Sequence, residues 1–160
     1  MKFEFGGGSP PSIMEALRQV AVNSDTLSIA VSYVQVSGWE LLKSAIAGSK
    51  VKNLRLLCTD QLGITDPNAV RAILNSGASV HAFTGKAVFH PKVFIGSRAS
   101  SADQFLLGSA NLSRSALMTG IEADCAGEDP KGELLEWFNS YFDDVSRSVP
   151  FDKERLEALD

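Results

Sequence analysis

Residues 26–35 read TLSIAVSYVQ and are rich in β-branched and aromatic side chains, which predicts a buried strand. Strands and helices alternate after it, with helices expected at 37–47 and 67–76 and strands at 53–59 and 79–83. Ser37 is the expected N-cap of the first of these helices, and Gly48 follows its end. This alternation is typical of an α/β domain whose sheet is covered by helices.

The pattern continues on both sides of this stretch. An amphipathic helix is expected at 12–22, with Ser12 as its N-cap. Towards the C-terminus we expect strands at 87–96, 104–109 and 120–127, and helices at 112–118, 130–145 and 151–159. The predicted fold class is α/β, a mixed β-sheet flanked by helices on both faces.

Length and composition favour one domain. The chain has 160 residues, of which 44% are hydrophobic, and this is enough for one sizeable core but not for two. We expect a single domain over residues 1–160 with its core at about 12–148. The tail, 149–160, is interpreted as a last helix or as the stub of a longer protein. No signal peptide and no membrane-spanning apolar run is found, so a cytoplasmic protein is expected.

Charge is distributed unevenly along the chain. The net charge is −4, but residues 1–121 carry 11 Lys and Arg against 7 Asp and Glu. Residues 122–160 carry 4 against 12. A locally positive site for a polyanion is therefore compatible with an acidic protein. Cys58 and Cys125 lie in strand-like runs and are interpreted as buried thiols, and no zinc-ligand spacing is found.

The tripeptide His90-Pro91-Lys92 leads into a predicted strand. Side chains two residues apart leave the same face of a strand, so the imidazole and the ammonium are expected side by side. Such a pair suits a phosphate, because one group attacks or transfers a proton while the other binds an anionic oxygen.

A second motif starts sixteen residues after Lys92, where residues 108–117 read GSANLSRSAL. A Gly/Ser turn between a strand and a helix presents backbone N–H groups to an anion. The alternative interpretation is that Asn111 or Ser113 only caps the following helix. Glu122, on the next predicted strand, can point into the same cleft and orient an imidazole.

Taken together, these residues resemble the His-x-Lys…Gly-Ser-x-Asn signature of the phospholipase D superfamily. The resemblance covers residues 27–127 and is nearest to its single-motif bacterial nucleases, which include metal-independent restriction endonucleases and helicase-associated nuclease domains. One position departs from the family pattern. Ser97 stands where the fuller motif has Asp, and Glu122 is the expected substitute.

The resemblance implies a metal-independent phosphodiesterase, most simply an endonuclease, that needs no cofactor. His90 would form a covalent phosphohistidine, and Lys92, Ser109 and Asn111 would bind the non-bridging oxygens. Glu122 would hold the His90 ring. Gly108, Ser113 and Arg114 are the candidate substrate contacts.

One chain supplies one such motif, so the expected partner is a second copy in a homodimer that shares the site. His81 could serve as the second histidine within one chain, but a structural role is the preferred interpretation. The expected substrate is nucleic acid, with DNA ahead of RNA, and a helicase or a target-recognition domain is a further candidate partner. No membrane association is expected.

Three alternatives stay open. The first is a lipid or small-phosphodiester hydrolase or transferase of the same superfamily. The second is a catalytically weak nucleic-acid-binding or dimerisation module of a larger restriction or helicase protein. The third is a metal-dependent site with one ion held by Asp60, His90, Glu122 and Asp124.

Overall fold

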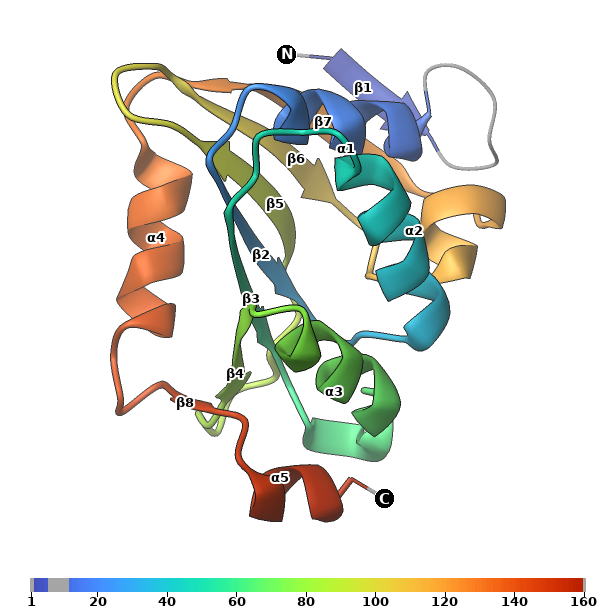
Figure 1. Ribbon diagram of the computed structural model, residues 1–160, viewed down its shortest axis with the longest axis vertical. Helices are drawn as coiled ribbons and strands as arrows, with labels where there is room; N and C mark the ends of the chain where they lie inside the picture. Colours follow the sequence, from blue (N-terminus) through green and yellow to red (C-terminus); the bar gives the residue numbers. More distant parts are fainter. Residues whose placement is uncertain (1, 6–11, 160) are drawn as a thin grey trace.

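The computed structural model describes residues 2–5 and 12–159, and these form one eight-stranded sheet with helices on both faces (Figure 1). The strands lie in the order β1-β7-β6-β5-β2-β3-β4-β8. Their bounds are Lys2–Phe5 for β1, Thr26–Val31 for β2, Asn53–Cys58 for β3, Ser79–Phe83 for β4, Lys92–Ser97 for β5, Asp103–Gly108 for β6, Ala123–Asp129 for β7 and Ser148–Pro150 for β8. The predicted mixed sheet is confirmed, because β2, β3 and β4 pair in parallel and the other neighbours pair antiparallel.

Three helices cover one face of the sheet and one helix covers the other. The first face carries α1 (Ile13–Val22), α2 (Val36–Ile46) and α3 (Pro67–Asn75). The second face carries α4 (Glu133–Phe142). The short α5 (Lys153–Glu157) lies against α3. Among the described helices, none combines the length and apolar character that crossing a bilayer requires.

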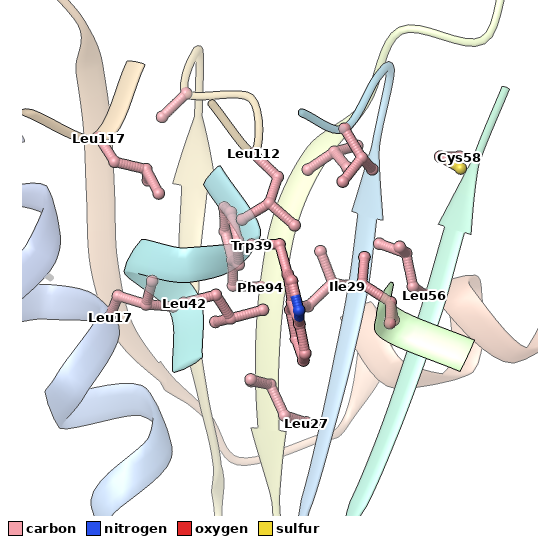
Figure 2. Close-up of a cluster of buried hydrophobic side chains, with 14 of the residues drawn as sticks. Leu17, Leu27, Ile29, Trp39, Leu42, Leu56, Cys58, Phe94, Leu112 and Leu117 are labelled. Carbon is pink, nitrogen blue, oxygen red and sulfur yellow. The ribbon is translucent and has the colours of Figure 1, made fainter. Parts of the chain in front are cut away.

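The larger core lies under α1, α2 and α3. Alternate side chains of β2 point to opposite faces, so Leu27 and Ile29 enter this core while Ala30 faces α4. Figure 2 shows Trp39 and Leu42 of α2 lying over the strand residues, with Leu112 entering the same cluster from the turn after β6. Trp39 and Phe94 are core residues, because they are 3% and 1% exposed.

The predicted N-cap is confirmed for α1 and is wrong for α2. The Ser12 hydroxyl accepts from the backbone N–H of Glu15 at 3.2 Å, so Ser12 is the N-cap of α1. The prediction for Ser37 is wrong. Gln35 is the N-cap of α2, and Ser37 lies inside the helix, where its hydroxyl accepts from the backbone N–H of Arg114 at 3.3 Å.

Several boundaries near the motifs also differ from the predictions. β5 begins only at Lys92, because Pro91 has no N–H to donate to a neighbouring strand, so His90 lies in the preceding loop. β7 begins at Ala123, which leaves Glu122 in the connection before it. The helix expected at 112–118 is a short π-helical turn, Ser115–Thr119.

The C-terminal segment packs against the rest of the molecule. Phe151 is buried in the larger core, and the Arg155 guanidinium forms an ion pair with Asp60. Cys58 is buried as predicted, whereas Cys125 on β7 is only partly buried; both thiols are free.

Candidate active site

The motif residues gather at one edge of the sheet because of its strand order. β5 is antiparallel to both β2 and β6, and β6 is antiparallel to β7. The end of β2, the start of β5, the end of β6 and the start of β7 therefore meet at the same edge. The register places Val31 opposite Lys92, and Gly108 opposite Asp124.

Lys92 is a buried cation held by two acceptors. Lys92 is only 6% exposed. Its Nζ donates to the Ser32 hydroxyl at 2.8 Å and to the His90 carbonyl oxygen at 3.1 Å. Burial lowers the pKa of this ammonium, and the charge of Glu122 opposes that shift. An ammonium has three donors, so one remains for a ligand.

Asn111 is held in one orientation by the end of β2. Its Oδ1 accepts from the backbone N–H of Ser32 at 3.1 Å and of Tyr33 at 3.4 Å. Only the carbonyl oxygen of the amide can accept these bonds, which fixes which side of the side chain carries the nitrogen. The amide nitrogen makes no hydrogen bond within residues 2–5 and 12–159, and it remains available as a donor to an anion.

Ser109 connects the turn to the start of β7. Its hydroxyl donates to the Glu122 carboxylate and accepts from the backbone N–H of Ala123 at 3.0 Å. The Glu122 side chain is therefore bound to the turn after β6 that carries Ser109. Among the described residues, the His90 ring has no hydrogen bond to it. His90 itself is exposed.

The turn can approach β7 closely only because residue 108 is glycine. A Cβ at Gly108 would lie 2.4 Å from the Ala123 carbonyl oxygen and 2.5 Å from the Asp124 Cα. Gly38 has a matching role on the other side, since a Cβ there would lie 2.0 Å from the Leu112 carbonyl oxygen. The turn is thus held between the start of α2 and β7.

Two predicted substrate contacts differ in exposure. Ser113 is 1% exposed, and its hydroxyl accepts from the backbone N–H of Ala116 at 3.3 Å, while its predicted role as a substrate contact stays a prediction. Arg114 is exposed, and within the described part of the chain its side chain forms no hydrogen bond or ion pair, so its predicted role as a substrate contact stays a prediction.

The side chains of the metal-dependent alternative are not gathered. Asp60 pairs with Arg155, and no three His, Cys, Asp or Glu side chains within the described part of the chain lie close enough to hold an ion.

His81 lies on β4, where its ring stacks on Phe142 at 3.9 Å and its Nδ1 lies 3.2 Å from the Ser148 hydroxyl. Burial lowers the pKa of His81, and this environment agrees with a structural role.

One residue of the site was not predicted, and another was assigned a different contact. Ser32, directly after β2, bonds both Lys92 and Asn111. Because the sequence predicts a strand over 26–35, no local signal marks Ser32 as the residue that follows a strand end. Asp124 was considered only as a metal ligand, yet it is 4% exposed and its Oδ1 accepts from the backbone N–H of Ala110 at 3.3 Å. Its Oδ2 is buried and has no hydrogen-bond partner among residues 2–5 and 12–159.

Comparison with known proteins gives matches among solved structures alone. No protein-family model matches the chain, and no curated protein does. The phospholipase D family member Nuc from Salmonella typhimurium superposes with a TM-score of 0.70 at 18% identity, covering 95% of this chain and 97% of that one. Phosphatidylserine synthase from Haemophilus influenzae Rd KW20 gives a TM-score of 0.62 at 16% identity, covering 99% and 41%.

A mutant of yeast tyrosyl-DNA phosphodiesterase gives a TM-score of 0.59 at 12% identity, covering 99% of this chain and 39% of that one. The Nuc match extends over nearly the whole of both chains, and the other two proteins contain this architecture within a longer chain. The chain therefore has the fold of the phospholipase D superfamily, as the resemblance of its two motifs implied.

Proposed function

We propose that this chain is a phosphodiesterase that cleaves nucleic acid, most simply as an endonuclease, through His90 and without a metal ion. One observation carries the proposal. An exposed imidazole lies two residues from a buried ammonium that retains one free donor, and an asparagine held by β2 retains a free amide nitrogen. Such pre-set donors stabilise the charge that develops on phosphoryl oxygens.

The proposed reaction has two steps. A ring nitrogen of His90 attacks phosphorus, and the bond from phosphorus to the leaving oxygen breaks as a second histidine protonates that oxygen. Water then attacks the phosphohistidine, gives its proton to the second histidine and releases a phosphate monoester and free His90. Lys92 and Asn111 hold the non-bridging oxygens in both steps, and Ser109 joins them when its hydroxyl turns from Glu122.

The second histidine is proposed to be His90 of another copy, in a homodimer. The surface around the site supports this arrangement. Val88 is 79% exposed and Ile121 is fully exposed, one residue before Glu122, and Leu107 near the end of β6 is 38% exposed. Exposed apolar side chains that flank a polar site favour an interface. A twofold axis there would bring the two imidazoles to one phosphate.

The decisive test is turnover of bis-(p-nitrophenyl) phosphate and of labelled single- and double-stranded DNA and RNA, with EDTA present. We expect cleavage by the wild type and none by His90→Ala. Acid quenching should trap label on His90. Loss of turnover in EDTA would exclude a metal-independent reaction. Full activity of His90→Ala would exclude His90 as the nucleophile.

Dimer sharing has its own test. Mixing wild type with an excess of His90→Ala and allowing subunit exchange should suppress activity well beyond simple dilution, because mixed dimers have one imidazole. Ile121→Asp should give an inactive monomer in sedimentation velocity. An active monomer would exclude the shared site.

A lipid phosphodiester is the second candidate substrate. The name of the similar Haemophilus protein refers to phosphatidylserine, and that of the similar yeast protein to tyrosyl-DNA. The same exposed apolar residues that favour a dimer could also contact a lipid surface. Product analysis with phosphatidylcholine vesicles beside DNA separates the two, and salt-sensitive DNA binding without hydrolysis would indicate a binding module.

A further inference from the structure

Ser32 stands between the two side chains that the proposed reaction uses to hold phosphoryl oxygens. It follows directly after β2 and is 6% exposed. Its hydroxyl accepts from Lys92 Nζ at 2.8 Å, and its backbone N–H donates to Asn111 Oδ1 at 3.1 Å. The pairing of Val31 with Lys92 brings β2 and β5 together at this point.

We propose that Ser32 is a positioning residue that sets Lys92 and Asn111 as one unit, with the serine hydroxyl aiming the ammonium and the serine backbone aiming the amide. This inference rests on the proposed function. It assigns Ser32 no contact with the reacting atoms, because its hydroxyl acts through Lys92.

The donor geometry supports this role. A lysine side chain is flexible and its ammonium has no preferred direction of its own. With one N–H bonded to Ser32 and a second to the His90 carbonyl oxygen, the direction of the third is fixed. Fixing donors before the substrate arrives avoids reorganisation during the reaction.

Asn111 is positioned by backbone alone. The adjacent N–H groups of Ser32 and Tyr33 converge on its Oδ1 at 3.1 and 3.4 Å. A side-chain substitution at Ser32 keeps this pair of bonds and removes only the bond to Lys92. The two halves of the unit can therefore be separated experimentally.

The pKa of the Lys92 ammonium also gives a readout that a folding defect would not reproduce. The titratable groups near the ammonium are the Glu122 carboxylate, directly before β7, and His90, two residues before Lys92. The end of β2 and the turn after β6 contribute the uncharged side chains of Ser32, Ser109 and Asn111. An accepting hydroxyl favours the charged ammonium. Removing it lowers the pKa of Lys92, so activity is lost at a lower pH on the alkaline side.

The test compares Ser32→Ala and Ser32→Cys, which remove a strong acceptor, with Ser32→Thr, which keeps a hydroxyl. Ser24→Ala is the matched control. Ser24 is another buried serine, 2% exposed, at the opposite end of β2, and its hydroxyl donates to the Val20 carbonyl oxygen at 2.7 Å.

With bis-(p-nitrophenyl) phosphate as the substrate, kcat of the two removal variants should fall about tenfold or more with a smaller change in KM. Their alkaline limb should move to lower pH. Ser32→Thr should recover most of kcat, and Ser24→Ala should match the wild type. A folded Ser32→Ala or Ser32→Cys protein with unchanged kcat and an unchanged alkaline limb would overturn the inference. A wild type that hydrolyses no phosphodiester would instead count against the proposed function.

Discussion

The hydroxyl of Ser109 donates a hydrogen bond to the carboxylate of Glu122, across the junction between β6 and β7. This contact gives Glu122 a partner on the turn after β6, and its predicted role of holding the His90 ring stays a prediction. Glu122 fixes the turn that carries Ser109, and its charge acts on Lys92 at the same edge of the sheet.

Glu122→Gln should shift the pH dependence of activity. The Glu122 charge raises the pKa of Lys92, so removing that charge lowers it further. Because the proposed reaction needs the ammonium, the alkaline limb of kcat/KM should move to lower pH. Glu128→Gln is the control, since Glu128 lies near the other end of β7 and bonds Gln104 at 3.2 Å. An unmoved limb in Glu122→Gln would contradict the electrostatic role.

Asp124→Asn should change how stability varies with pH. Burial raises the pKa of Asp124 above its ordinary 3.8, so the folded protein binds a proton more tightly than the unfolded chain does. Stability from this group is therefore greatest at low pH and falls as pH rises from 3.8 through the raised folded value. Urea unfolding at several pH values should show the gap between Asp124→Asn and wild type moving in favour of the variant as pH rises. A constant gap would refute the linkage.

Gly108→Ala should damage both stability and turnover. The new Cβ would meet backbone atoms of β7 at 2.4–2.5 Å, and backbone cannot yield as a side-chain end can. We expect a loss of about 1–3 kcal/mol in the free energy of unfolding. Gly48→Asn is the control, because Gly48 has φ +77 with nothing near its Cβ position and asparagine tolerates that conformation. Equal losses in both variants would argue against crowding at Gly108.

Arg155→Gln should loosen the C-terminal helix. The Arg155 and Asp60 side chains are 30% and 20% exposed, so their ion pair is partly shielded from solvent. We expect a loss of about 1 kcal/mol in the free energy of unfolding that shrinks at high salt. The pair of Lys153 and Glu157 is 90% and 63% exposed, and Lys153→Gln should have no measurable effect. Thermal melts of both variants at two salt concentrations decide the question.

The sequence predicted the fold class and the two motifs because each depends on local information. The alternation of apolar strands with capped helices indicated a covered sheet, and the position of Ser12 before α1 fixed a helix start. The resemblance that His90, Lys92, Ser109 and Asn111 carry implied the superfamily fold. The edge strands β1 and β8 escaped prediction because four and three residues carry too little periodicity.

The contacts within the site could not be predicted, because they depend on strand order. Whether Glu122 reaches His90 or Ser109 depends on the register between β6 and β7 and on where β7 begins. Ser32 could be joined to Lys92 only once β2 and β5 were known to be neighbours. Burial of Ser113 likewise follows from the close approach of α2 at Gly38, which no local pattern encodes.

The side chains of the site come from distant parts of the polypeptide, since Ser32 and Asn111 are 79 residues apart and meet only through the paired central strands. Contacts of such long sequence separation form late and together in folding. A partly folded chain would therefore lack the assembled site on which the proposed reaction depends. Recovery of the proposed turnover after dilution from denaturant should accordingly not precede burial of Trp39.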